Sequence, residues 1–407
     1  MILETTGNKM DSEKLIKRFR IVILNTLANM SAPVANMVCS WLVIRWISPE
    51  LWGSYTKIFL LLMLALQITG FGSKEFLLRE FSKSPKDIFN HWFSSLRSRF
   101  FLVIGGIILF VFFPFENDLK ITFICWLLVR FLYLSFDPIL LFQKKIGITL
   151  LLESLALVFF GLLLWIRPEN TGVLWLMNSF LLLDALKALV LSVYFSKEIK
   201  TALNGGYRMS FFTGAFPFFL LSISGMISSR ADLYLVSFNL DKIQVAQYSV
   251  LLNFLIYLQA LSNFIFQPFM KNFYRINRQA TKRMITQFWG IGILVAMLGV
   301  PAILWGCAIF FHLEFNTVFL WIGILYVVPV YFYLPKIYYL YKIGKEKTVL
   351  NVNLAGIILN ISLNILWLPS LGMTGALLAA SLVQVLNVAL YLFIEKKIIK
   401  NDLIKVS

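Results

Sequence analysis

The stretch FICWLLVRFLYLSFDP, residues 123–138, is a run of mostly large apolar side chains with one arginine, Arg130, near its middle. Apolar residues continue on both sides and extend the run over residues 119–142. Because a helix rises 1.5 Å per residue, about 20 apolar residues cross the hydrocarbon core of a membrane. The stretch therefore predicts a transmembrane helix. Its arginine cannot lose its charge in a protein and lies near the predicted bilayer centre.

The composition of the whole chain follows the same pattern. Of its 407 residues, 59% are hydrophobic and only 14% are charged, whereas about 25% are charged in a soluble domain. Continuous apolar runs favour helices over the alternating strands of a membrane barrel. The predicted fold class is an all-α polytopic membrane protein with about twelve spans, at residues 21–44, 52–76, 100–115, 119–142, 147–166, 171–195, 211–236, 244–268, 285–311, 317–341, 348–368 and 372–394.

The net charge of +17 is distributed asymmetrically. With the N-terminus placed in the cytoplasm, the predicted cytoplasmic segments contain 27 of the 37 Lys and Arg residues, and the opposite loops contain 4. This is the positive-inside bias of an inner or plasma membrane protein. It predicts that both termini are cytoplasmic, and it accounts for the basic charge without nucleic acid as a partner.

The chain contains an internal repeat. GSYTKIFLLL (53–62) is similar to AQYSVLLNFL (246–255), and KIG at 145–147 aligns with KIG at 342–344. Six spans per copy give both copies the same orientation, which predicts two six-helix halves related by a pseudo-twofold along the membrane normal. The predicted parts are a cytoplasmic N-terminal segment (1–20), an N-terminal six-helix half (21–195), a cytoplasmic connector (196–210), a C-terminal six-helix half (211–394) and a cytoplasmic tail (395–407).

Three segments carry a resemblance to a known family: SPELWGSY followed by ITGFGSKEFLLREFSK (48–83), SSRADLYLVSFNLDKIQVAQYSV (228–250) and NILWLPSLGMTGALLAAS (364–381). In order and spacing they resemble the multidrug/oligosaccharidyl-lipid/polysaccharide (MOP) exporter superfamily. Length and charge are most similar to its polysaccharide or O-antigen flippases (Wzx type). In the last segment, Gly372 and Gly375 are expected to flank a tight turn, where left-handed backbone and close helix approach favour glycine.

The resemblance implies a MATE/MOP-like fold that moves undecaprenyl-diphosphate-linked oligosaccharide across the bacterial inner membrane by alternating access. The implied partners are the lipid-linked oligosaccharide, membrane lipid, and a polysaccharide polymerase with its chain-length regulator. The sequence contains no catalytic motif and no spacing of metal ligands, so the protein is not expected to be an enzyme or to hold a cofactor or metal.

Charged residues inside the predicted spans are the candidate site residues, because such charges usually face an interior or a water-filled cavity. Lys74, Lys336 and Glu153 lie close enough to the cytoplasmic ends to reach the surface. Asp184 and Lys187 are spaced to pair on one helix face. The full set is Lys57, Lys74, Glu75, Arg130, Asp137, Glu153, Asp184, Lys187, Arg230, Asp232 and Lys336.

Arg130 and Arg230 have no acid one helical turn away, so the excess charge is positive and suits a diphosphate head group. We expect these two arginines to bind it, followed by Lys57 and Lys187. Coupling to a proton or sodium gradient is assigned, as a hypothesis, to Asp184 and Asp232. The alternative for Arg130 is a buried ion pair with an acid on another helix, such as one of these two aspartates.

Two other functions remain open. A multidrug exporter of the same superfamily should have an acid in its first span, and residues 21–44 contain none. A membrane polysaccharide polymerase or ligase usually needs a large external loop with catalytic residues, and the predicted outer connectors are all short.

Overall fold

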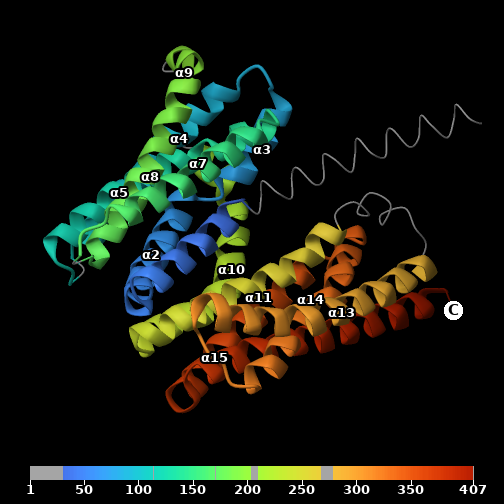
Figure 1. The fold of residues 1–407 in the computed structure, drawn as a ribbon. Coiled ribbons are helices and arrows are strands. Elements are labelled where there is room, and N and C mark those ends of the chain that lie inside the picture. The colour runs from blue at the N-terminus through green and yellow to red at the C-terminus, as the bar shows by residue number, and fades with distance from the viewer. Residues whose placement is uncertain (1–30, 113, 170, 203–209, 267–277, 407) are drawn as a thin grey trace, which may run out of the picture. The chain divides into compact units, whose positions relative to one another are not determined.

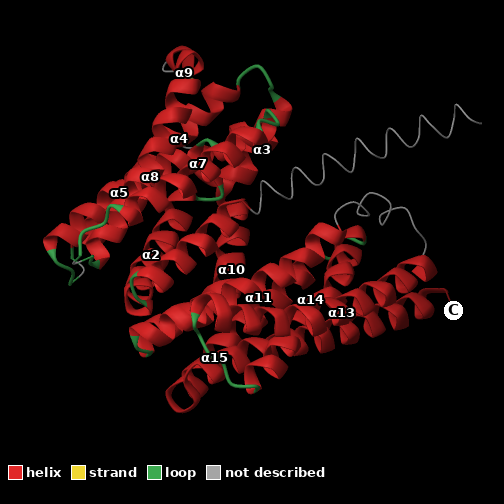
Figure 2. Cartoon of the chain, viewed as in Figure 1, coloured by secondary structure: helices red, strands yellow, loops and turns green. Residues whose placement is uncertain are grey.

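The computed structural model describes residues 31–112, 114–169, 171–202, 210–266 and 278–406. Every regular element in these ranges is a helix (Figure 2). A first helix covers residues 31–46; the start of the predicted span 21–44 and the segment 1–20 lie outside the described residues. The helices that follow are α2 (Pro49–Gly70), α3 (Ser73–Lys83), α4 (Ile88–Val111), α5 (Asn117–Ser135), α6 (Asp137–Phe142), α7 (Ile146–Trp165), α8 (Val173–Tyr194), α9 (Ser196–Ala202), α10 (Ser210–Asn239), α11 (Lys242–Phe266), α13 (Arg278–Phe311), α14 (Val318–Lys342) and α15 (Glu346–Val406).

The helices belong to two compact units, and most of the helices are labelled in Figure 1. One unit comprises Met1–Leu42 and Leu61–Leu221, and the other comprises Val43–Leu60 and Ser222–Ser407. The first unit therefore contains α3 to α9 and the second contains α11 to α15, while α2 and α10 contribute residues to both. The domain boundaries expected from the repeat remain a prediction.

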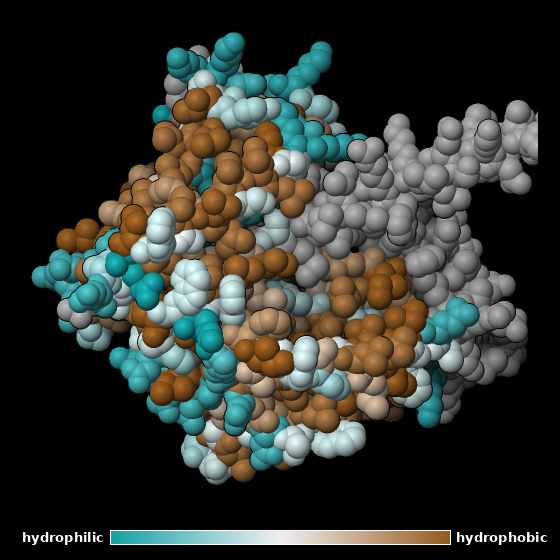
Figure 3. All heavy atoms as spheres, viewed as in Figure 1, coloured by the Kyte–Doolittle hydropathy of each residue, from teal (hydrophilic) through white to brown (hydrophobic). Residues whose placement is uncertain are grey.

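Nine stretches of the described chain are long and apolar enough to cross a membrane. Among them, Asn117–Phe142 and Gly147–Trp165 match the predicted spans 119–142 and 147–166 closely. In the second of these stretches only 22% of the most apolar window is buried inside the protein, and Trp165 is 80% exposed. Figure 3 shows extensive hydrophobic areas on the outside of the molecule. Since apolar surface of this extent suits lipid rather than water, the chain is a multi-pass membrane protein.

The predicted span at 52–76 is interrupted in the structure. Phe71 and Gly72 separate α2 from α3, and both have positive φ, 45° and 63°. The backbone at Gly72 is also tightly enclosed, because an added Cβ would lie 2.4 Å from the backbone nitrogen of Phe219. The predicted span falls within the apolar spanning stretch Pro49–Lys83, but the break was not predicted, since a two-residue left-handed break leaves no trace in hydropathy.

The predicted span at 100–115 starts too late. The helix α4 begins at Ile88, within a segment (79–99) that was predicted to be a cytoplasmic loop. Four polar side chains of this first half are buried, namely those of Ser94, Ser95, Ser98 and Arg99. A helix whose polar face packs against protein has low hydropathy, which explains the error.

The turn predicted at Gly372 and Gly375 is confirmed. Within α15, Gly372 has a non-helical backbone (φ 55°, ψ −138°) that divides the long helix where a tight turn was expected. A Cβ added to Gly375 would lie 2.6 Å from the carbonyl oxygen of Trp367, so only glycine fits this close approach. In the stretch that opened the sequence, the predicted span 119–142 consists of two helices, since α6 begins at Asp137 with Pro138 in its first turn and the residue before a proline disfavours continuation of a straight helix.

A close backbone contact within the second unit joins α2 to the start of α11. A Cβ added to Gly53 would lie 1.7 Å from the carbonyl oxygen of Lys242. We expect Gly53→Ala to force the two backbones apart, destabilise the fold by about 1–3 kcal/mol and lower the melting temperature of the purified protein. Gly70→Ala is the control, because nothing lies within 4 Å of its added Cβ. Equal melting temperatures for the two variants would contradict the contact.

Candidate functional site

Four charged side chains of the first unit form one network across three helices. Arg130 of α5 donates from Nη1 to Oδ2 of Asp184 on α8, at 2.8 Å. Lys187, one turn further along α8, donates from Nζ to Oε2 of Glu153 on α7, at 2.9 Å. Lys187 Nζ also lies 3.6 Å from the other carboxylate oxygen, Oδ1, of Asp184. Two cations and two anions therefore balance each other's formal charge.

The four side chains differ in their exposure. Asp184 is 4% exposed, Glu153 is 8% exposed and Lys187 is 11% exposed, whereas Arg130 is 21% exposed. Taking one charge away from such a buried pair costs about 3–5 kcal/mol, because the partner is then left uncompensated. Arg130 is thus the most exposed member of the network.

Two aromatic side chains of α5 complete the network. The indole Nε1 of Trp126 donates to Oδ2 of Asp184, and the hydroxyl of Tyr133 donates to Oε1 of Glu153, both at 2.8 Å. Trp126, Arg130 and Tyr133 follow each other at i, i+4 and i+7, which places them on one face of α5. Both acids are thus held by a cation and by a neutral donor.

The contacts in this network can be compared with several predictions made from the sequence. Arg130 pairs with an acid on another helix, which was the alternative considered for it. The expected contact between Asp184 and Lys187 exists, but it is longer than the bond that each makes to a different helix. The expectation that Glu153 reaches the cytoplasmic surface was wrong, because Tyr133 and Lys187 hold it inside the protein. Periodicity gave no signal for these pairs, since their members are 54 and 34 positions apart.

Lys336 in the second unit was also expected to reach the surface, and this was wrong. Its side chain is buried in α14, forms an ion pair with Glu395 and lies 4.6 Å from the centre of the Phe332 ring. The partner was missed because it belongs to the last helix, 59 positions away.

Arg230 and Asp232 of α10 lie in the second unit and do not pair with each other. Arg230 donates from Nη1 to the amide oxygen of Asn253 on α11, at 2.6 Å. Asp232 is 3% exposed and accepts bonds from the Tyr248 hydroxyl and the Leu233 backbone N–H, at 2.6 and 2.9 Å. Within the described part of the chain, no carboxylate forms an ion pair with Arg230. Its charge is therefore held by a neutral amide, in contrast to that of Arg130.

Lys57 makes a different kind of contact. Its Nζ donates to the carbonyl oxygen of Leu240, at 3.0 Å, immediately after the last residue of α10. Lysine side chains commonly satisfy the free carbonyls at a helix C-terminus, so this contact stabilises the end of α10. The substrate-binding role of Lys57, like that of Lys187, remains a prediction.

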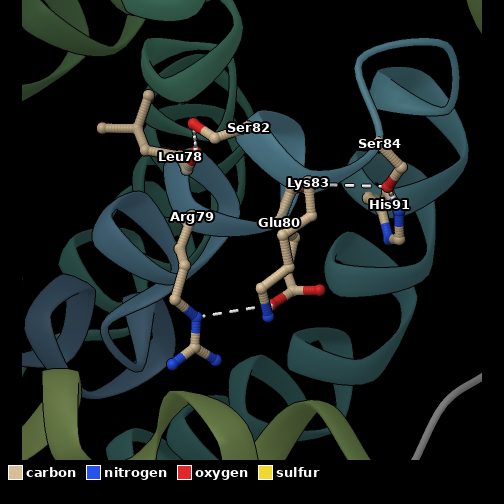
Figure 4. A network of polar contacts seen from close by, with 7 residues as sticks. All are labelled: Leu78, Arg79, Glu80, Ser82, Lys83, Ser84 and His91. Atoms are coloured by element: carbon tan, nitrogen blue, oxygen red, sulfur yellow. Dashed lines mark hydrogen bonds and ion pairs between the residues drawn. The ribbon is translucent and has the colours of Figure 1, made fainter.

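An exposed polar network surrounds the end of α3 (Figure 4). Glu80 accepts bonds from Arg79 and Lys83, at 3.3 and 2.9 Å, and Ser84 bonds to His91 at 2.8 Å. The basic side chains are 47% and 62% exposed, and exposed pairs of this kind contribute about 0–1 kcal/mol. This is a solvated helix end rather than a binding site.

Arg99 is a buried cation that sequence reasoning missed, because it was assigned to a loop. It is 2% exposed, donates from Nε to the Ser95 hydroxyl at 3.2 Å, and lies 4.9 Å from the centre of the Phe131 ring. The i,i+4 spacing of Ser95 and Arg99 was the available signal. As for metals, no cluster of His, Cys, Asp or Glu among the described residues could hold one.

No protein-family model and no curated protein matches the sequence, but solved structures do. The lipid II flippase MurJ, in an inward closed conformation, is 17% identical with a TM-score of 0.65, covering 92% of this chain and 87% of that chain. An inward-facing multidrug resistance MATE family transporter of the MOP superfamily is 14% identical with a TM-score of 0.68, covering 95% and 99%. The eukaryotic MATE transporter AtDTX14 is 14% identical with a TM-score of 0.58, covering 93% and 95%. The chain therefore has the all-α fold of the MOP-superfamily transporters.

Proposed function

We propose that the protein is a flippase that moves an undecaprenyl-diphosphate-linked oligosaccharide, such as an O-antigen or similar polysaccharide repeat unit, across the bacterial inner membrane. The fold supports a transporter, since a lipid II flippase and several MATE transporters share it. The observation that carries the choice of a diphosphate-linked lipid is Arg230, an intramembrane cation held by a neutral amide.

The chemistry of Arg230 suits a diphosphate. A guanidinium has five N–H donors, and the contact with Asn253 uses Nη1. The carboxylate of the nearby Asp232 accepts hydrogen bonds from the Tyr248 hydroxyl and the Leu233 backbone N–H instead. An uncompensated cation inside a membrane costs about 3 kcal/mol on insertion scales. Phosphate oxygens match the paired donors of arginine and supply the missing negative charge.

Asp232 is the better of the two predicted coupling residues. Its carboxylate is buried, and no cation lies within ion-pair distance of it in the described residues. Asp184, in contrast, is held by Arg130 and Lys187. A buried carboxylate with only neutral donors can take up a proton or a sodium ion without breaking an ion pair.

The test is deletion of the gene in its own host. We expect the deletion strain to accumulate lipid-linked oligosaccharide on the cytoplasmic face and to lose surface polysaccharide, and a plasmid copy should restore both. An enzyme that polymerises or ligates the sugar would instead leave the intermediate on the outer face. A deletion strain with normal polysaccharide but increased sensitivity to cationic drugs would contradict the proposal in favour of a multidrug exporter.

A further inference from the structure

Asp184 is held on two sides by cations of unequal accessibility. Its Oδ2 atom accepts bonds from Arg130 and Trp126, both at 2.8 Å. Its Oδ1 atom faces Lys187 at 3.6 Å, beyond hydrogen-bond length but within ion-pair distance. Arg130 is 21% exposed and Lys187 is 11% exposed. An anion that approaches the network therefore meets Arg130 first, and there it competes with Asp184.

We infer that Asp184 and Lys187 are positioning residues for a phosphate site at Arg130. The Asp184 carboxylate stays bonded to the Arg130 guanidinium until the diphosphate binds there, and the carboxylate then bonds to Lys187 instead. This rests on the proposed function and specifies the head-group contact in the first unit.

The geometry provides for the transfer. Lys187 has three N–H donors, of which one bonds to Glu153 at 2.9 Å. Asp184 lies one turn away on the same face of α8, so a change of side-chain torsions closes the gap of 3.6 Å. Glu153 keeps its hydrogen bond from the Tyr133 hydroxyl while Asp184 changes partner. When Arg130 leaves, Asp184 and Glu153 share Lys187, so each carboxylate keeps an ion-pair partner while the three groups together carry one net negative charge.

Trp126 provides a direct readout. Its indole N–H donates to the carboxylate oxygen of Asp184 that Arg130 also binds. When the arginine leaves and Asp184 moves toward Lys187, the environment of that N–H must change. The change reports the transfer itself, independently of transport.

The experiment is an NMR titration of the full-length purified protein, labelled with ¹⁵N-tryptophan, with inorganic pyrophosphate. Comparison with Trp126→Phe identifies the Trp126 indole signal, and calorimetry measures the affinity in parallel. We expect pyrophosphate to shift the Trp126 signal in the wild type. In the double variant Glu153→Gln/Lys187→Met the affinity at this site should fall about tenfold or more, because the released Asp184 has no cation to receive it.

The double variant leaves no stranded partner from the Lys187–Glu153 pair, so it is expected to fold. Its matched control is Lys336→Met/Glu395→Gln, which removes the same kind of pair from the second unit and should titrate like the wild type. Equal affinity of the two double variants would overturn the inference. So would pyrophosphate binding that leaves Trp126 unmoved and is lost in Arg230→Ala, a result that leaves the proposed function intact. A wild-type protein that binds no pyrophosphate at all would contradict both.

Discussion

Replacing Arg230 by alanine is expected to abolish export of the lipid-linked oligosaccharide while the membrane abundance of the protein stays normal. The arginine is held by the Asn253 amide, so its removal strands no buried carboxylate. Asp232 keeps its bonds to Tyr248 and to the Leu233 backbone. Loss of a charge-assisted contact to the diphosphate costs about 2–5 kcal/mol, which corresponds to roughly a 30-fold or greater loss of head-group affinity.

The measurement is surface polysaccharide in the deletion strain carrying each variant, read beside immunoblot levels. Arg230→Lys keeps the charge but loses the paired donors, so it should retain partial export. Arg79→Ala removes an exposed arginine of the other unit and should export normally. An abundant and fully active Arg230→Ala protein would exclude the head-group role, and a scarce one would show that Arg230 is structural.

Replacing Glu153 by alanine is expected to cause a large loss of folded protein. The substitution strands the ammonium of Lys187 and the hydroxyl of Tyr133, both of which Glu153 binds. Breaking a buried pair in this way costs about 3–5 kcal/mol, and the lower end applies because Lys187 still faces Asp184 at 3.6 Å. Since domains are stable by only about 5–15 kcal/mol, the variant should be scarce and melt early in detergent.

The double variant Glu153→Met/Lys187→Met distinguishes a buried pair from two independent side chains. Replacement of both members by apolar residues removes the stranded charge, so stability should return toward the wild-type value. The melting temperatures of both single variants and the double variant form a thermodynamic cycle. Additive losses would mean that the two residues do not interact.

Local sequence was sufficient to predict the fold class. The spanning stretch Asn117–Phe142 falls within a few residues of its predicted limits. The turn at Gly372 is also where it was expected. These features depend on hydropathy summed over about 20 consecutive residues or on the backbone preferences of single residues such as Gly and Pro. Both kinds of information are local in the chain.

Tertiary structure decided which charges meet. From the sequence, Arg130 and Arg230 were equivalent intramembrane cations without a local acid. The fold pairs the first with Asp184 and gives the second only the amide of Asn253. The same holds for Glu153, whose position near a helix end suggested exposure, although α5 and α8 enclose it. A side chain's partner depends on the rotation and neighbours of its helix, and in a membrane those are set by packing between helices, which hydropathy along one helix does not contain.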